Sequence, residues 1–178
     1  MEDLKFHIFD TPIGKMGIIW SGLGITGLAL PHGTSKELRK FIGDKFLTAA
    51  QAIPDRRVTN CCRQIVKFLN AKRYSFADID IDLSGRTDFE RIVYETLFET
   101  NPGSQMTYGE LASVCGYPKC ARAVGRAMAT NRVPIIIPCH RVVPASGGVG
   151  HYSGNGGSDL KRKLLEIEAG ISAPVANR

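Results

Sequence analysis

The feature that most restricts the backbone of this chain is a group of prolines around the apolar stretch IIIPCHRVVP, residues 135–144. Pro138 and Pro144 lie within the stretch, and Pro134 precedes it. Each proline fixes its own φ angle and lacks an amide hydrogen, so the chain between them has few available conformations. A segment restricted in this way suits a site whose chemical groups must be held in place.

Cys139 and His140 are adjacent in this stretch, and Arg141 follows them. A nucleophilic cysteine must be populated as thiolate, which needs a base or a positive neighbourhood. In an extended segment adjacent side chains point to opposite faces, so we expect a water or a turn to connect Cys139 with His140 rather than a direct bond. The alternative is that Cys139 is a small buried hydrophobe, because free cysteine is among the most buried residue types.

Length and composition place the chain among globular proteins of one domain or two small ones. Its 178 residues are 43% hydrophobic, enough to bury a sizeable core. Five cysteines are an odd number without a disulfide pattern, which predicts a reducing compartment. The first ten residues mix both charges and do not resemble a signal peptide, and the uncharged residues 16–35 are too rich in glycine for a membrane span. We therefore expect an intracellular protein with no membrane partner, cytoplasmic or, in a eukaryote, nuclear.

The first part of the chain predicts a small antiparallel sheet with helices, an α+β arrangement. Strand patterns joined by glycine-containing turns cover residues 5–14, 15–20 and 25–31. Helical spacing of apolar residues follows at 35–46 and 59–73, and DIDIDL, residues 78–83, alternates as a short strand does. A seam at Gly85 separates this half from the rest.

The second half predicts mainly helices. Residues 87–103 carry one apolar stripe, with Thr87 and Glu90 placed to form a capping box. A short helix is expected from about Tyr108 to Val114, and another over residues 119–131. Two short helices joined by a tight glycine-containing turn indicate a helix-turn-helix, although such pairs are often only packed helices.

The second helix of this pair has a basic face and a slim profile. Lys119, Arg122 and Arg126 lie at i, i+3 and i+7, and the residues between them are mostly Ala or Gly. Such a face lets the backbone approach a nucleic-acid groove, whereas the alternative is an ordinary solvated surface. The segment from Cys115 to Lys163 has a net charge of +7, more than the +6 of the whole chain. Its basic residues are Lys119, Arg122, Arg126, Arg132, Arg141, Lys161, Arg162 and Lys163.

Several motifs together resemble the O6-alkylguanine-DNA alkyltransferase family. They are PCHRVV with NRVPIIIP before it, GGVGHYSG after it, TYGELA and KCARAVGRAM upstream, and LLEIEAG downstream. The resemblance runs from about Asp88 to Gly170 and is weaker at DTPIG and GLAL in the first half. It implies a repair protein that moves an alkyl group irreversibly from O6 of guanine in double-stranded DNA onto its own cysteine.

The resemblance also implies a role for particular residues. Cys139 is the acceptor, and His140 acts on it through a water while Glu168 holds the histidine. Tyr108 donates to the guanine ring, Asn131 braces the site, and Arg122 replaces the flipped base in the stack. The other implied substrate contacts are Ser153, Val142, Met128, Tyr152 and Pro134, and the other implied DNA contacts are Ala121, Arg126, Lys119 and Thr107.

The fold that the resemblance implies has two domains. Residues 1–84 form a ribonuclease H-like α+β domain, and residues 85–178 form a winged-helix-like domain that carries the helix-turn-helix. We expect a monomer without a cofactor. We also expect no metal, because His7, His32 and the pair Cys61 and Cys62 make no convincing zinc ligand set, so the two cysteines are assigned to helix core. Two alternatives stay open: a non-repairing damage sensor, which would lack the acceptor cysteine, and a cysteine hydrolase, which would leave the basic helix unexplained.

Overall fold

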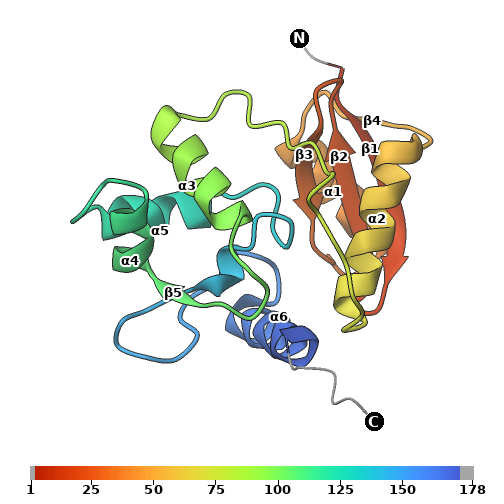
Figure 1. Cartoon of the computed structure of the whole chain (residues 1–178). Coiled ribbons are helices and arrows are strands. Elements are labelled where there is room, and N and C mark those ends of the chain that lie inside the picture. The colour runs from red at the N-terminus through yellow and green to blue at the C-terminus, as the bar shows by residue number, and fades with distance from the viewer. Residues whose placement is uncertain (1–2, 173–178) are drawn as a thin grey trace.

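A four-stranded sheet forms the first part of the chain in the computed structural model, which describes residues 3–172. Its strands are β1 (Lys5–Thr11), β2 (Gly14–Trp20), β3 (Ile25–Ala29) and β4 (Ala50–Gln51), in the spatial order β3-β2-β1-β4 (Figure 1). β1 pairs with β2 and β2 with β3 in antiparallel fashion, which confirms the three expected strands.

The expectation of a purely antiparallel sheet is wrong at one edge. β4 runs parallel to β1, with Lys5 opposite Ala50 and Phe6 opposite Gln51. Helix α1 (Ser35–Lys45) lies between β3 and β4 in the chain, and a crossover of this kind is what parallel pairing requires. A strand of two residues is too short to show an alternating pattern, so the sequence gives no sign of it.

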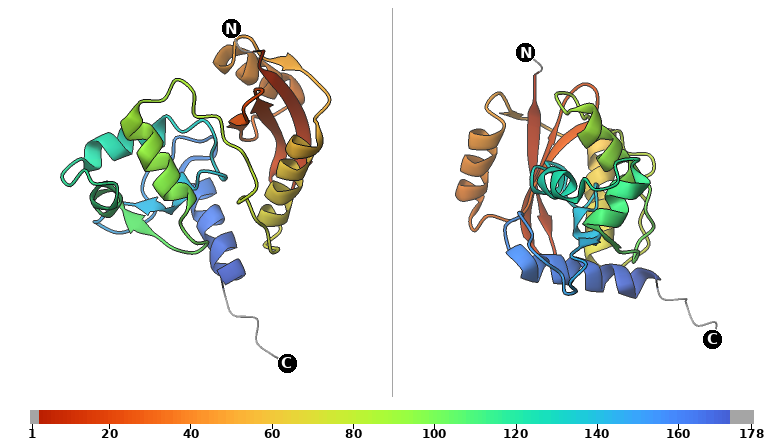
Figure 2. Two further views of the ribbon diagram at one scale, coloured as in Figure 1. Left: turned by 45° about the horizontal axis from the view of Figure 1, so that its top comes forward. Right: turned by 90° about the vertical axis from the view of Figure 1, so that its left-hand side faces the viewer.

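Helices α1 and α2 (Arg56–Leu69) cover opposite faces of this sheet (Figure 2). Successive residues of a strand point to opposite faces, and β2 shows the consequence. Ile19 packs in a cluster with Ile42 of α1, whereas Ile18 packs in a second cluster with Ile65 of α2. The sheet therefore has no solvent-exposed face over its central strands.

The alternating segment DIDIDL does not form a strand. Ile81 makes a single isolated bridge to Ile25, through hydrogen bonds from Ile25 N to Asp80 O and from Asp82 N to Ile25 O. The segment crosses the beginning of β3 and then leaves it, so only one pair of residues meets. The alternation of Asp and Ile in this segment therefore corresponds to a single bridge with β3 and not to a row of paired residues.

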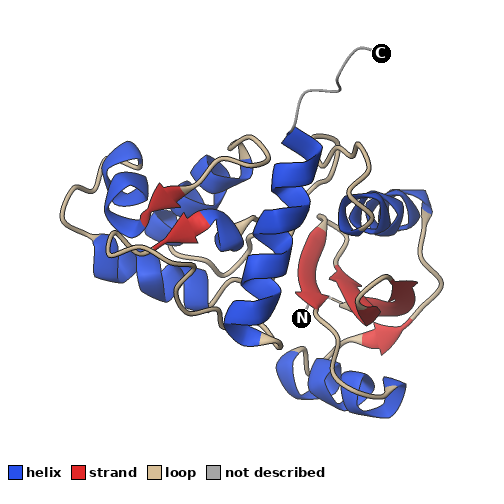
Figure 3. Ribbon diagram, turned by 90° about the horizontal axis from the view of Figure 1, so that it is seen from below, coloured by secondary structure: helices blue, strands red, loops and turns tan. Residues whose placement is uncertain are grey.

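The second part of the chain is helical. Its helices are α3 (Asp88–Phe98), α4 (Tyr108–Val114), α5 (Ala121–Ala129) and α6 (Gly157–Ser172), and a short parallel pair is formed by β5 (Met106–Thr107) and β6 (Val142–Val143). The capping box of Thr87 and Glu90 begins α3 as expected. Seen from below, α6 runs between the sheet and the other helices (Figure 3). No helix within residues 3–172 is both long and apolar enough to cross a membrane.

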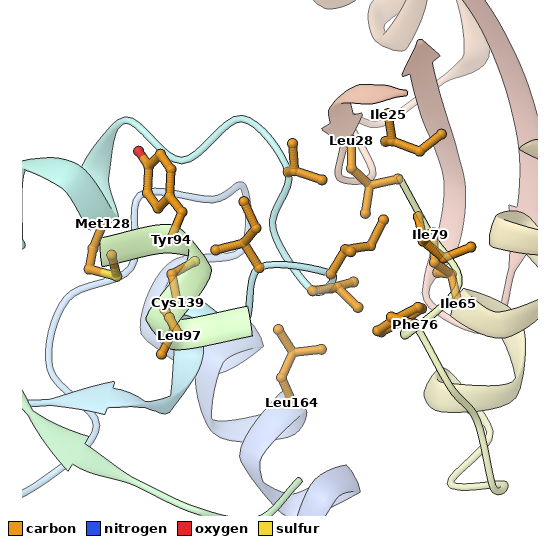
Figure 4. Close-up of a cluster of buried hydrophobic side chains, with 14 of the residues drawn as sticks. Ile25, Leu28, Ile65, Phe76, Ile79, Tyr94, Leu97, Met128, Cys139 and Leu164 are labelled. Atoms are coloured by element: carbon orange, nitrogen blue, oxygen red, sulfur yellow. The ribbon is translucent and has the colours of Figure 1, made fainter. Parts of the chain in front are cut away.

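One apolar cluster continues from the sheet into the helical part (Figure 4). Leu28 of β3 and Ile65 of α2 belong to the same cluster as Leu97 of α3, Leu164 of α6 and Cys139. Because interiors pack at high density, a cluster of this kind transmits displacements from one half to the other. The expected acceptor thiol is thus built into the core that joins the two halves.

Gly27 of β3 provides a test of how closely α1 lies against the sheet. A Cβ atom at Gly27 would come 2.4 Å from the ring of Phe46, whereas a Cβ at Gly43 on α1 would meet nothing within 4 Å. We expect Gly27→Ala to lower the free energy of unfolding by about 1–3 kcal/mol through overpacking. The matched control Gly43→Ala should raise it by about 0.5–1 kcal/mol, because alanine favours the helix. Urea unfolding measures both, and equal effects of the two substitutions would contradict this packing.

Candidate active site

The backbone around Cys139 turns instead of running straight. Cys139–Arg141 forms a single turn of 3-10 helix, η1, closed by a hydrogen bond from Arg141 N to Pro138 O of 2.9 Å. These residues are therefore not extended, and of the two links expected between Cys139 and His140, a water or a turn, the backbone forms the turn. The chain bends where the fixed φ of Pro138 enters it. Cys139 lies 5% exposed and His140 is fully buried.

The loop before η1 is strained and is held from several sides. Ile135 has a φ of 74°, a left-handed conformation that costs energy for a β-branched residue. Asn131 braces this loop: its Nδ2 donates to Ile137 O at 3.0 Å, and its Oδ1 accepts from Val133 N at 2.9 Å. The amide of Leu28 in β3 donates to Arg132 O at 2.7 Å. The sheet of the first half thus supports the loop that leads to Cys139.

His140 and Arg141 share the buried carboxylate of Glu168. His140 Nε2 lies 2.8 Å from Glu168 Oε1, and the guanidinium of Arg141 donates to both carboxylate oxygens from Nε and Nη2, at 2.8–3.1 Å. The amide of Gly103 donates to Glu168 Oε2 at 3.0 Å. Arg141 also donates to both oxygens of Thr100. Glu168 lies on α6, so this cluster joins α6, η1 and the turn after α3.

The protonation of this cluster follows from its burial and its hydrogen bonds. Burial alone would raise the pKa of Glu168, but hydrogen bonds from His140 and Arg141 lower it to about 2. Burial lowers the pKa of His140, and the charges of Arg141 and Lys161 act in the same direction against the opposing effect of Glu168. His140 is therefore a neutral imidazole beside an ionised carboxylate. A carboxylate only accepts hydrogen bonds, so Nε2 carries the proton and Nδ1 carries the lone pair.

The surroundings of the Cys139 thiol act in two directions on its pKa. Burial raises the pKa, whereas the side chains of Asn131 and Tyr152 and the charge of Lys161 favour the thiolate. Burial and the charge of Cys139 raise the pKa of Tyr152. Within the described residues, Tyr152 Oη has no partner in hydrogen-bond geometry. The thiol is thus kept protonated at rest and surrounded by groups that stabilise its ionised form.

A cavity of about 500 Å³ opens beside Cys139. Four of the residues assigned to the site from the sequence line it together with the thiol: Asn131, Pro134, Tyr152 and Ser153. The remaining implied contacts Met128 and Val142 are 6% and 0% exposed and do not contribute to its lining. Tyr108 is half-buried at the start of α4, and burial together with the charge of Cys139 raises its pKa.

The helix-turn-helix consists of α4 and α5, but its basic face differs from the prediction in one respect. α5 begins at Ala121, so Lys119 belongs to the preceding turn, where it has a φ of 74°. Arg122 and Arg126 are exposed on α5 and have no ion-pair partner within residues 3–172. Ala121 is half-buried, and Thr107 caps α4 by accepting from Glu110 N. The two arginines are therefore free to meet an anionic surface.

Comparisons with known proteins agree with this geometry. Residues 88–170 match the family described as 6-O-methylguanine DNA methyltransferase, DNA binding domain. A methylated-DNA--protein-cysteine methyltransferase of Mycobacterium tuberculosis is 33% identical over 165 residues, which cover 93% of this chain and 92% of that protein. The chain belongs to this methyltransferase family. A member from Mus musculus is 31% identical over 93% of this chain and 81% of its own length.

Solved structures of methyltransferase family members share the fold. The crystal structure of Mycobacterium tuberculosis OGT in complex with DNA superposes with a TM-score of 0.76, at 33% identity, over 92% of both chains. The O6-methylguanine methyltransferase of the same organism gives a TM-score of 0.79 at 31% identity, covering 98% of this chain and 96% of that one. The corresponding protein of Pyrococcus kodakaraensis gives a TM-score of 0.68 at 33% identity, covering 93% of this chain and 98% of that one.

Sequence reasoning missed the buried position of Lys161 in this methyltransferase fold. Lys161 is 1% exposed, and its Nζ donates to Val142 O at 2.7 Å. Lys161 and Arg141 both belong to the segment from Cys115 to Lys163 that carries a net charge of +7, and both are buried. A signal was present: Lys161, Leu164 and Glu168 lie at i, i+3 and i+7, the spacing of one buried helix face. Charged residues on such a face indicate a buried site.

Glu168 gives a pH-dependent prediction. Its pKa is about 2 in the folded protein and near 4.5 in the unfolded chain, so its ionised form stabilises the fold above pH 4.5 and loses this contribution as the pH falls towards 2. The difference in unfolding free energy between the wild type and Glu168→Gln should therefore shrink over this range, by up to about 1.4 kcal/mol per pH unit. Urea titrations at pH 7, 4.5 and 3 measure it.

Glu166→Gln is the matched control, because Glu166 is exposed on the same helix. The difference between wild type and this variant should stay nearly constant with pH. A constant difference for Glu168→Gln as well would contradict the assignment of an ionised, hydrogen-bonded carboxylate.

Proposed function

We propose that this protein repairs DNA by transferring a methyl or other alkyl group from O6 of guanine in double-stranded DNA to Sγ of Cys139, once per molecule. The observation that carries this proposal is the buried arrangement of Cys139 beside a neutral His140 whose Nε2 is held by Glu168. This arrangement supplies a nucleophile, a base and a group that orients the base. The cavity next to the thiol supplies space for a substrate.

In this mechanism His140 removes the thiol proton through a bridging water. His140 Nδ1 is buried and, in the part of the chain that the structure describes, has no hydrogen-bond partner. An imidazole that is neutral and donates from Nε2 has its lone pair on Nδ1, so this nitrogen is able to accept a proton. Glu168 then stabilises the imidazolium that forms, through the hydrogen bond at 2.8 Å.

The thiolate attacks the carbon attached to O6. The bond between sulfur and carbon forms as the bond between carbon and O6 breaks, and the electron pair leaves with the guanine. Tyr108 donates a hydrogen bond to a ring nitrogen of the departing base, and Ser153, which lines the cavity, lies near O6. These donors stabilise negative charge where it develops, which lowers the barrier to transfer.

The substrate base must leave the duplex to reach a thiol that is 5% exposed. Flipping costs a few kcal/mol, and a side chain that fills the gap offsets part of this cost. Arg122 is exposed on α5, and the small residues around it let this helix lie close to the DNA. We propose that Arg122 takes the place of the flipped base, while Lys119, Arg126, Ala121 and Thr107 contact the adjoining strand.

We further propose that residues 1–84 and 85–178 act as two domains of a monomer. The first is ribonuclease H-like and supports the acceptor loop; the second is winged-helix-like and carries the DNA-binding and alkyl-acceptor groups. Two contacts by which the first half supports this loop are the hydrogen bond from Leu28 N to Arg132 O and the continuous apolar core that includes Cys139. Tyr152 and Pro134, which line the cavity, form walls around the flipped base. Met128 and Val142 do not line it and support these walls from the apolar cluster that they share with Tyr152.

A transfer assay with labelled DNA tests the proposal. We expect a duplex with isotopically labelled O6-methylguanine to lose one methyl group per protein molecule, and mass spectrometry to find that group on Cys139. Cys139→Ser should lose all transfer, whereas Cys120→Ser, which changes a half-buried cysteine outside the cavity, should keep it. Tight binding with the label left on DNA would indicate a damage sensor instead, and repeated turnover would indicate a hydrolase.

Arg122→Ala separates base flipping from chemistry. We expect this variant to react at least tenfold more slowly with O6-methylguanine in a duplex, because the gap in the stack is no longer filled. Its reaction with the free base O6-benzylguanine should stay within about twofold of the wild type, since that substrate needs no flipping. Arg162→Ala is the matched control, because Arg162 is an exposed arginine on α6 that pairs with Asp159. Equal losses on both substrates would contradict the role of Arg122.

A further inference from the structure

The cavity beside Cys139 extends beyond the second half of the chain. The thiol, Asn131 and Tyr152 of the second half line it together with Phe41, Lys45 and Phe46, which belong to α1 and the residue after it. Its volume of about 500 Å³ falls within the range of pockets that hold drug-sized ligands. It therefore has room for more than a purine base with a methyl group.

The two halves of the molecule are fitted closely where they enclose this cavity. A Cβ atom on Gly154, in the loop after Tyr152, would come 2.5 Å from Leu30 of the first half. The side chain of Asn155 donates to Pro31 O. His32 stacks on Phe41 with ring centroids 3.9 Å apart, and its Nδ1 is fixed by Leu30 O at 2.7 Å. The first half thus contributes an ordered wall of apolar and aromatic groups to the cavity.

The charged side chains that line the cavity are all basic. Among the residues that the structure describes, no aspartate or glutamate lines the cavity, whereas Lys45, Arg86 and Arg132 do. Arg86 is neutralised by Glu90, 3.5 Å away. Lys45 and Arg132 have no carboxylate partner within residues 3–172, and Arg132 lies over the ring of Phe46, 5.8 Å from its centroid. Both cations are exposed and line the cavity, so they stand where it meets solvent.

We infer that Lys45 and Arg132 form a specificity subsite that binds the far end of a large O6 substituent bearing a carboxylate on an aromatic ring. This inference rests on the proposed transfer to Cys139 and adds the class of adduct that the site prefers. The ring of such a substituent packs against Phe41 and Phe46, and its carboxylate reaches the two unpaired cations. An uncharged substituent of the same shape gains the apolar contacts alone.

Transfer of such a group needs no additional reactant. The bond from Cys139 Sγ to the benzylic carbon forms, the bond from that carbon to O6 breaks, and the electron pair stays on guanine. The thiol proton passes to His140, and the carboxylate remains ionised throughout. The charged adduct and its neutral counterpart therefore react by the same step and differ only in how the cavity holds the substituent.

Three duplexes of identical sequence test the inference, with O6-(4-carboxybenzyl)guanine, its neutral analogue O6-(4-carbamoylbenzyl)guanine, or O6-methylguanine at one position. We expect the wild type to react about fivefold faster with the carboxylate than with the carboxamide, the scale of partly exposed ion pairs. Lys45→Gln and Arg132→Gln should each reduce this ratio, and the double variant should bring it to about one. The rate on O6-methylguanine should stay within about twofold of the wild type.

Lys40→Gln is the matched control, because Lys40 lies on the same helix, pairs with Asp44 and does not line the cavity. It should leave the ratio unchanged. A wild-type ratio of one would overturn the inference, as would a ratio that survives the double variant. Equal slowing of all three adducts by Lys45→Gln or Arg132→Gln would also overturn it, since that result assigns the cations to the DNA backbone. Failure of the wild type to take methyl from DNA would instead overturn the proposed function.

Discussion

The buried carboxylate of Glu168 organises the parts of this protein that meet at Cys139. It accepts hydrogen bonds from His140, from Arg141 and from the amide of Gly103, and thereby ties α6 to η1 and to the turn after α3. Arg141 extends the connection to Thr100 and to the hydroxyl of Tyr74 in the first half. A buried charge is tolerated only when its partners are in place, so the loss of any one of them leaves the others uncompensated. The same contacts that secure the fold therefore set the proton position on His140.

The cavity shows that the first half of the chain does more than support the second. Leu28 holds the loop before Cys139 through Arg132 O, and Leu30 packs closely against Gly154, which also lines the cavity. The apolar cluster is continuous between these points and includes Cys139. Because such an interior is closely packed, a displacement of the loop before Cys139 is transmitted to the first half of the chain.

Much of this arrangement could be predicted from the sequence, for identifiable physical reasons. Thr87 with Glu90 and the periodic stripe after them placed α3, and the glycine-rich turns placed β1 to β3, because these patterns depend on local geometry. β4 and the burial of Lys161 were missed, because they depend on contacts between distant segments. The pairing of His140 with Glu168 was reached through a family resemblance, since no local rule links residues 28 positions apart. The cavity could not be predicted from any single motif, because residues from both halves of the chain line it.

The central claim is that Glu168 holds His140 as a neutral imidazole with its proton on Nε2 and its lone pair on Nδ1. Nitrogen-15 NMR of protein labelled in histidine measures both features, and the signals of His140 among the four histidines can be assigned with His140→Gln. At pH 6.5, where an ordinary imidazole is about half protonated, we predict a neutral ring with Nε2 protonated and Nδ1 bare. An imidazolium at that pH, or a proton on Nδ1 in the neutral ring, would contradict the account.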